Sequence, residues 1–296
     1  MATARKIGPT LACEITPERV IAARRSDDGA SLDSYTARAL AGGVVTPHLA
    51  EANVSNAEAL RQAISDALTT VGSRSHDVIA IVPDAAVRVA LLEFDTLPER
   101  KAEADGVIRF RLKKALPFDV EKAHLSYEII RADGKVRVAC AVVLSSVLQE
   151  YETIFRDLGF SPGIVLPSSV ASLGNVHSAD PVMMIKSDAY TTTLAIIGDG
   201  QLLLFRTLEN TTGSAPVTDQ LVEDVHASLV FFEDTYNMRV QTIMLGGQIE
   251  IDSLATALEQ QTGVRVQTLV SPDLVGTARP NFPPSALAGV VGALLG

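Results

Sequence analysis

The sequence contains no tryptophan, only two cysteines and few aromatic residues. Cys13 and Cys140 stand alone in apolar, strand-like segments, so we expect small core residues rather than a disulfide or a metal site. No stretch is apolar for long enough to form a signal peptide or a membrane span. These absences favour a protein that stays in the cytoplasm.

Positive charge is also scarce. The 25 Lys and Arg residues face 35 Asp and Glu residues, which gives a net charge of -10. Because nucleic-acid surfaces on proteins are basic, we expect no nucleic-acid partner. The exception is "RFRLKK", residues 109–114. This cluster either complements the dipole at the end of a helix or faces anionic lipid or an acidic partner.

The common catalytic motifs are missing as well. The sequence contains no P-loop, GxSxG or HExxH motif and no CxxC pair, and its five histidines lack metal-ligand spacing. We therefore predict no catalytic and no metal-binding residue. Gly246-Gly247 follows the strand-like "TIML", where paired glycines permit either close approach to a ligand or a tight structural turn.

What is present is one plan of elements that occurs twice. In the first half, strands at 11–15 and 20–23 flank a turn at 16–18, and a helix over 55–71 precedes a strand at 78–82. Ser55 and Glu58 predict a capping box for this helix, and Gly72 ends it. The second half repeats the plan with strands in 182–208, a helix over 218–236, a strand at 242–247 and a helix over 252–262. Two related α/β halves around a cleft explain the repeat.

Residues 84–160 follow another pattern, β-α-β-β-α. A strand over 87–98 precedes a helix over 99–116 that ends before Pro117. Strands at 124–130 and 136–144 flank a turn at 133–134, and a helix over 146–158 begins with the capping-box pair Ser146 and Gln149. We expect a compact inserted α+β subdomain.

Five segments together carry a family resemblance: "LACEITPERVIAARR", "RKAEADGVIRFRLKKALPFDVEKAHLSYEII", "VMMIKSDAYTTTLAIIGDGQLLLFRTL", "LVEDVHASLVFFEDTYNMRVQTIMLGG" and the closing "PPSALAGVVGALLG". In this order and spacing they resemble the PilM family, the actin-like cytoplasmic protein of type IV pilus assembly, which is related to FtsA and to the cytoplasmic part of GspL. The resemblance implies an α/β, actin-like (ribonuclease-H-like) fold of two halves. It assigns 1–83, 161–180 and 279–296 to subdomain IA, 84–160 to an inserted IC-like subdomain, and 181–278 to subdomain IIA.

The chain departs from this family where the family binds nucleotide. The matching positions are Glu14, Thr16, Lys186, Asp188, Gly246 and Gly247. In the first hairpin Pro17 offers no N–H group, and Glu18 adds negative charge. In the second, Lys186 replaces the metal-holding acid and Asp188 replaces a glycine. A carboxylate cannot donate a hydrogen bond to phosphate and repels it.

The spacing adds a second departure. Only residues 209–220 separate the second hairpin from the following helix, so we expect subdomain IIB, one wall of the family's adenine pocket, to be reduced or missing. We predict no cofactor and no ATP hydrolysis. The alternative is an ATPase that binds ATP and Mg²⁺ and uses Lys186 in place of the metal-binding acid.

The resemblance implies a non-catalytic scaffold in the bacterial cytoplasm, peripheral to the inner membrane. Its partner would be the short cytoplasmic N-terminal peptide of a PilN-like membrane protein, bound in a groove between subdomain IA and the insertion. The residues we expect there are Phe110, Leu116, Pro117 and Phe118, with Arg109 and Lys113 at a charged rim. A GspL-like subunit of a type II secretion platform is the alternative, and other platform subunits are further possible partners.

Overall fold

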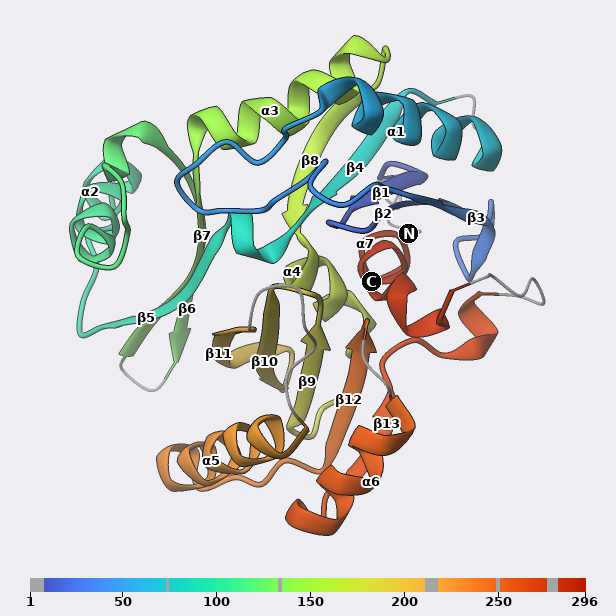
Figure 1. The fold of residues 1–296 in the computed structure, drawn as a ribbon. Coiled ribbons are helices and arrows are strands. Elements are labelled where there is room, and N and C mark those ends of the chain that lie inside the picture. Colours follow the sequence, from blue (N-terminus) through green and yellow to red (C-terminus); the bar gives the residue numbers. More distant parts are fainter. Residues whose placement is uncertain (1–7, 73–74, 133–134, 211–217, 249–250, 276–281) are drawn as a thin grey trace, which may run out of the picture.

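Two five-stranded sheets form the two halves of the molecule. The computed structural model describes residues 8–72, 75–132, 135–210, 218–248, 251–275 and 282–296. Figure 1 shows one sheet above the other, with helices α1 and α3 outside the upper sheet, α5 and α6 outside the lower sheet, and α4 and α7 between them.

The first sheet has the strand order β3-β2-β1-β4-β8. Strands β1 to β3 form an antiparallel meander, and β4 and β8 continue the sheet in parallel with β1. The elements are β1 (Leu11–Ile15), β2 (Arg19–Arg25), β3 (Leu32–Ala39), α1 (Ala57–Val71), β4 (Asp77–Val82), the short helix η1 (Asp84–Ala86) and β8 (Ser161–Pro167).

The second sheet repeats this topology, with the order β11-β10-β9-β12-β13. A meander again leads through a helix to two strands that run parallel to the first strand of the meander. The elements are β9 (Val182–Ser187), β10 (Thr191–Gly198), β11 (Gln201–Glu209), α5 (Thr218–Tyr236), β12 (Thr242–Gly247), α6 (Ile251–Thr262) and β13 (Arg265–Thr268). The predicted pair of related halves is confirmed.

The connection between β11 and α5 comprises residues 210–217. The prediction of a reduced or missing subdomain IIB falls on this connection, and residues 211–217 lie outside the described part of the chain. A connection of this length is too short to form a subdomain with its own core.

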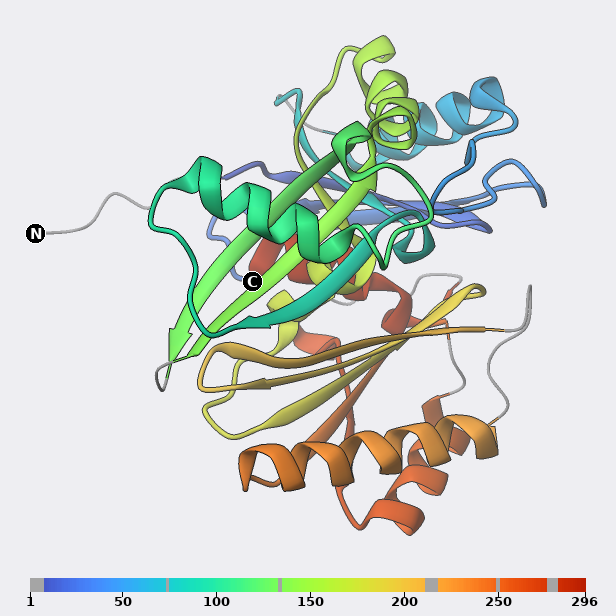
Figure 2. The same cartoon turned by 90° about the vertical axis from the view of Figure 1, so that its left-hand side faces the viewer.

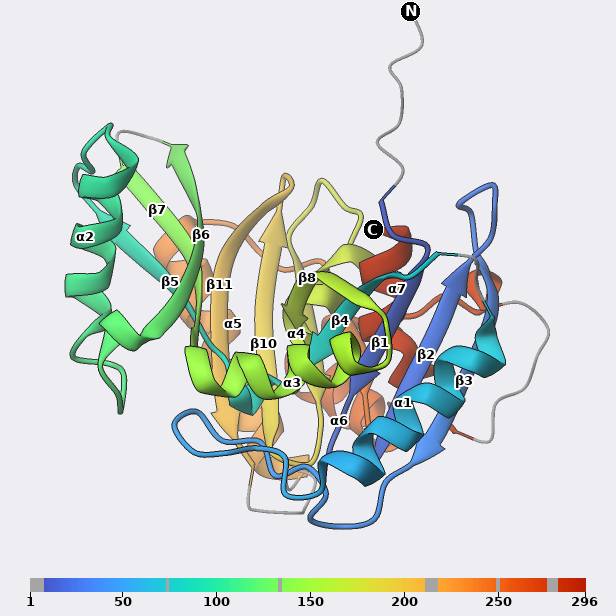
Figure 3. The ribbon, with the colours of Figure 1, turned by 90° about the horizontal axis from the view of Figure 1, so that it is seen from above.

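A third sheet, β5-β7-β6, makes up the insertion. Its elements are β5 (Arg88–Phe94), α2 (Lys101–Leu112), the short helix η2 (Val120–Lys122), β6 (Ala123–Ala132) and β7 (Lys135–Leu144). Helix α2 packs Ile108 and Leu112 on the face of this sheet formed by Val136, Val138, Cys140 and Val142. Figures 2 and 3 show this unit at one side of the molecule, with α2 outermost.

Helix α3 (Ser145–Asp157), which we expected within the inserted unit, packs elsewhere. Its buried side chains Val147, Tyr151, Ile154 and Phe155 share a core with α1 and the first sheet. The Tyr151 hydroxyl donates to the side-chain oxygen of Asn53 at 3.0 Å. The boundaries 84–160 and the other subdomain ranges stay predictions.

Three local predictions are wrong. Asn56, not Ser55, caps α1, and its side chain accepts the N–H of Ala59 at 3.0 Å, while the Ser55 hydroxyl turns back to the carbonyl of Gly43. Helix α3 starts after Leu144 with no side-chain cap, because β7 runs directly into it. Helix α2 ends at Leu112, its last buried residue, and not at 116, because Lys113, Lys114 and Ala115 face solvent and gain nothing from packing.

The two halves meet through α4 (Ser168–Ser172) and α7 (Ala288–Leu295), with the short helices η3 (Leu173–Asn175), η4 (Pro272–Leu274) and η5 (Pro284–Leu287) beside them. Their apolar side chains form one core with the inner faces of both sheets. A Cβ on Gly292 would lie 2.2 Å from the carbonyl oxygen of Ala171, so only glycine lets α7 approach α4 this closely.

Candidate functional site

The interface between the halves holds a buried cluster of four ionisable side chains: Glu14 near the end of β1, Asp84 in η1, Lys186 in β9 and Asp188 just after β9. The Nζ of Lys186 lies 3.0 Å from Oδ2 of Asp84 and 3.7 Å from Oδ2 of Asp188. The pair of Lys186 and Asp84 therefore joins the two halves across the cleft.

Helix α4 fixes both acids of the first half. The backbone N–H and the hydroxyl of Ser169 donate to Oδ1 of Asp84 at 2.8 and 2.7 Å. The Ser168 hydroxyl donates to Oε1 of Glu14. The other oxygen of Glu14 is buried without a partner among the described residues, and this arrangement favours a protonated carboxyl group.

Burial and neighbouring charge shift the pKa values of this cluster. Burial raises the pKa of Glu14 to about 7, against the opposing attraction of Lys186. For Lys186, burial disfavours the ammonium, but the negative charges of Asp84, Asp188 and Glu14 outweigh it and raise its pKa above the ordinary value. Burial also raises the pKa of Asp188, although Lys186 opposes the shift. We therefore describe the cluster as one ammonium group among three carboxyl groups, with the pKa values of Glu14 and Asp188 both raised by burial.

The turn after β9 uses its own carboxylate to occupy its amide donors. Oδ1 of Asp188 accepts the backbone N–H groups of Tyr190 and Thr191, both at 2.8 Å. In a phosphate-binding hairpin such amides would point at the ligand. Phosphate could use these donors only after displacing Asp188.

The first hairpin turn is closed in a similar way. The N–H of Thr16 donates to the carbonyl of Arg19 at 2.9 Å, and the N–H of Arg19 donates to the Thr16 hydroxyl at 3.1 Å. Across the cleft, Nε2 of Gln248 donates to Oε2 of Glu18 at 3.1 Å. The negative charge of Glu18 thus lies within a contact between the two halves.

The paired glycines serve close packing. Gly247 has a φ of +91°, and a Cβ there would lie 2.1 Å from the carbonyl oxygen of Ser187. A Cβ on Gly246 would lie 2.8 Å from Cδ2 of Leu269. Of the two interpretations of Gly246-Gly247, these contacts support the structural one.

A separate apolar groove of about 700 Å³ lies between the insertion and the rest of the molecule. Its walls are β6 and β7 on one side, β8 and α4 on the other, with the β10–β11 turn at one end. A smaller hollow of about 200 Å³ continues it and shares Ser126, Ala141, Val165, Leu166 and Pro167. Within the described residues, β6 and β8 are each the last strand of their sheet, so both present unpaired backbone edges.

The residues predicted to bind the partner lie on the other side of the inserted sheet. Alternation along β7 places the side chains of Ala139 and Ala141 at the groove and those of Val138 and Val142 against α2. Leu116 and Phe118 are partly buried against the core between α2 and the inserted sheet, while Phe110, Lys113 and Pro117 are exposed. Arg109 pairs with Asp105 at 2.7 Å and donates to the carbonyl of Val120. The structure thus groups these six residues around α2, away from the groove.

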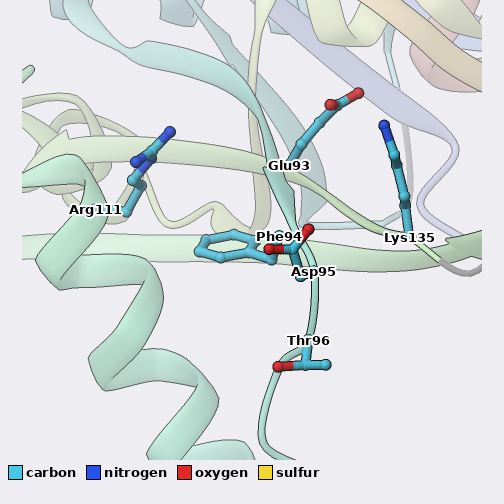
Figure 4. Close-up of a pocket in the computed structure, with 6 residues that line it drawn as sticks. All are labelled: Glu93, Phe94, Asp95, Thr96, Arg111 and Lys135. Carbon is cyan, nitrogen blue, oxygen red and sulfur yellow. The ribbon is translucent and has the colours of Figure 1, made fainter.

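A polar hollow of about 440 Å³ lies at the outer end of the insertion. In Figure 4, Arg111 of α2 and Lys135 of β7 lie on either side of Glu93 and Phe94, with Asp95 and Thr96 below. Its two cationic and two acidic residues balance, so the hollow favours neither an anion nor a cation.

Both cysteines are buried free thiols, in keeping with the prediction that they are core residues. Burial raises the pKa of both Cys13 and Cys140. Within the described residues no group of three or more His, Cys, Asp or Glu side chains could hold a metal ion. None of the described helices is long and apolar enough to cross a membrane.

Sequence reasoning missed Asp84 and Ser168, the partners of Lys186 and Glu14. Asp84 had one available signal, since it is an acidic residue just past the buried strand 78–82 and its Pro83. The groove had another, since residues 138–144 of β7 read VACAVVL, a nearly continuous apolar run that indicates a strand covered on both faces.

The comparisons with known proteins agree with this topology. A chain of a PilM–PilN type IV pilus biogenesis complex is 18% identical, has a TM-score of 0.79 and is covered over 97% of both chains. The cytoplasmic domain of EpsL, an inner membrane component of the type II secretion system of Vibrio cholerae, is 10% identical with a TM-score of 0.53, over 95% of this chain and 93% of that one.

A Bacteroides thetaiotaomicron protein with an actin-like ATPase fold is also 10% identical with a TM-score of 0.53, over 86% of this chain and 89% of that one. No protein-family model and no curated protein matches the sequence. At these identities the likeness concerns the fold, and it agrees with the two sheets of identical strand order: the chain has the actin-like fold.

Proposed function

We propose that this protein is a non-catalytic scaffold of a bacterial inner-membrane pilus machine and binds an extended peptide from a PilN-like membrane protein. The observation that carries the proposal is the apolar groove between β6 and β8, two strands that end their sheets. Similarity over nearly the whole length to a chain of a PilM–PilN complex supports the choice of partner.

The groove suits an extended chain. A peptide lying beside β6 or β8 would form main-chain hydrogen bonds with a strand edge, which provide affinity independent of sequence. Its alternate side chains would enter the apolar floor formed by Ala139, Ala141 and Leu166. Most of β8 is exposed or half-buried, from Gly163 to Leu166, as expected of a strand with room for a neighbour.

The cleft supports a scaffold without ATP hydrolysis. Lys186 already binds two carboxylates there, and Asp188 already accepts the amides of its turn. ATP would have to break these contacts and would gain no glycine-rich turn in return. Nucleotide binding with Mg²⁺ is therefore the less favoured alternative.

A peptide from a membrane protein would hold this chain at the cytoplasmic side of the inner membrane. The likeness to the EpsL cytoplasmic domain makes a type II secretion platform the second candidate machine. Both candidates share the peripheral location and differ in the partner that supplies the peptide.

The test is binding of a fluorescently labelled N-terminal peptide of the PilN-like protein from the same genome, measured by anisotropy. Ala141→Arg would fill the groove floor and should abolish binding. Ala227→Arg, on the exposed face of α5, is the matched control and should leave binding unchanged.

The predicted α2-side residues need their own variants. Phe118→Ala and Leu116→Asp should weaken binding if those residues contact the peptide, and leave it unchanged if the groove alone does. Full binding by Ala141→Arg would exclude the groove. If the peptide also failed to bind the unmodified protein, the proposed partner would be excluded.

A further inference from the structure

We propose that the outer face of α2 is a docking surface for an anionic phospholipid membrane. The surface consists of Val107 and Phe110 on α2 and of Lys113 and Lys114 directly after its last residue. It is independent of the groove and of the peptide proposed to bind there, because the inserted sheet lies between the two.

The apolar part of this surface has no explanation in the fold. Phe110 is 77% exposed, the highest value among the exposed large hydrophobic residues, and Val107, one helical turn before it, is 37% exposed. The buried face of α2 is complete without them, since Ala104, Ile108 and Leu112 fill it. Two adjoining apolar side chains exposed on one helix face, with polar residues around them, indicate an interaction site.

The charged part directly follows the helix. Lys113 caps the end of α2, and its N–H still donates to the carbonyl of Arg109 at 3.0 Å, so Lys113 lies about one helical turn after Phe110 and Lys114 comes next in the chain. Lys113 and Lys114 are exposed and have no acidic partner within the described part of the chain. The nearest acids on the helix, Glu103 and Asp105, pair with Arg100 and Arg109.

Exposed apolar side chains next to these two lysines favour a lipid surface as the binding partner. The chain carries a net charge of -10, so two free lysines beside an exposed aromatic ring are a local reversal of its general charge. An acidic peptide would satisfy the lysines but leave Phe110 in water. An anionic bilayer takes up both, with the ring at the headgroup level and the ammonium groups near the phosphates.

The position of α2 permits this contact. Figures 1 and 3 show α2 at the outer side of the insertion, away from both large sheets, and in Figure 2 this side of the molecule faces the viewer. A flat membrane could therefore touch α2 without meeting the body of the molecule first.

Co-flotation of the full chain with vesicles tests the lysines. Vesicles containing phosphatidylglycerol should bind the protein, and pure phosphatidylcholine vesicles should not. Because one cation near an anionic surface contributes about fivefold in binding, Lys113→Gln with Lys114→Gln should lower binding about 25-fold. Arg239→Gln with Arg265→Gln, two exposed cations on the second half, is the charge-matched control and should bind like the unmodified protein.

The absence of tryptophan from the sequence allows a direct test of the aromatic ring. Phe110→Trp introduces a single reporter, whose emission should shift to shorter wavelength on phosphatidylglycerol vesicles and be quenched by brominated lipid. Phe231→Trp, at a 58% exposed position on α5, should show neither effect.

Three outcomes would overturn the proposal: equal binding to both kinds of vesicle, equal binding by the two double variants, or an unshifted emission of the Phe110→Trp protein on bound vesicles. Binding of soluble polyglutamate, but not of vesicles, that is lost in Lys113→Gln with Lys114→Gln would assign the surface to an acidic protein instead.

Discussion

The ammonium group of Lys186 lies 3.0 Å from a carboxylate oxygen of Asp84, a residue 102 positions away in the chain and in the other half of the molecule. Both side chains are 5% exposed. The family resemblance assigns the phosphates and metal of a nucleotide to the space between the two hairpin turns. Lys186 brings a positive charge of the protein itself to this place and joins the two halves.

Lys186→Met should therefore destabilise the protein strongly. It leaves Asp84 and Asp188 buried without a cation, and breaking a buried ion pair from one side costs about 3–5 kcal/mol. Urea unfolding at pH 7 measures the loss. Arg239→Met breaks a mostly exposed pair with Glu233 and should cause no measurable change.

The double variant Asp84→Asn with Lys186→Met provides the cross-check. Because it removes both charges of the pair, it should lose less stability than the two single variants added together. Strict additivity would mean that the two residues do not interact.

Mg-ATP at millimolar concentration should leave the melting temperature unchanged. The turn amides of Tyr190 and Thr191 are already bound to Asp188, and Pro17 has no amide hydrogen to offer in the other turn. A thermal-shift series and calorimetry measure this. A melting temperature that rose with the logarithm of ATP concentration, as mass action requires, would restore the ATPase alternative.

Glu14 should make stability depend on pH in an unusual direction. Its pKa is about 7 in the folded protein against an ordinary value of 4.5, so the folded state holds a proton that the unfolded state releases. Stability from this group is therefore complete below pH 4.5 and declines by about 3 kcal/mol as pH rises to 7.

Glu14→Gln should remove this decline, seen as the difference between the two unfolding curves from pH 5 to 8. Glu121→Gln, at an exposed carboxylate, should run parallel to the unmodified protein. A Glu14→Gln curve with the original slope would place the pKa of Glu14 near its ordinary value.

Gly247→Ala should cost about 3 kcal/mol or more. The added Cβ would lie 2.1 Å from the Ser187 carbonyl oxygen, so strand β9 must shift to make room for it. The left-handed backbone at this position adds strain of its own, because a residue with a Cβ is disfavoured there. Gly263 has a φ of +68° with nothing within 4 Å of an added Cβ, so Gly263→Ala isolates the strain at about 1 kcal/mol. Equal losses would show that β12 is not held by the close contact to β9.

The local pattern of the sequence determined most of the elements, because alternation and helical periodicity depend on neighbours within a few residues. The hairpins, α1, α5 and the repeated order of strands follow from such patterns. The first residue of a helix depended on competition between neighbouring residues that can each cap it. Asn56 and Ser55 are both good caps, and only the path of the chain past Gly43 gave Asn56 the role.

The resemblance to the PilM family also marked Lys186 and Asp188 as departures from a nucleotide site, because they stand where that family has an acid and a glycine. What they do instead was decided by tertiary structure. Asp84 reaches Lys186 only because β4 and β9 both end at the interface between the two halves, and the pKa of Glu14 is raised because burial removes its carboxyl group from water. The groove between β6 and β8 likewise arises from how two sheets meet. An apolar run shows that both faces of a strand are covered, but it does not show which element covers each face.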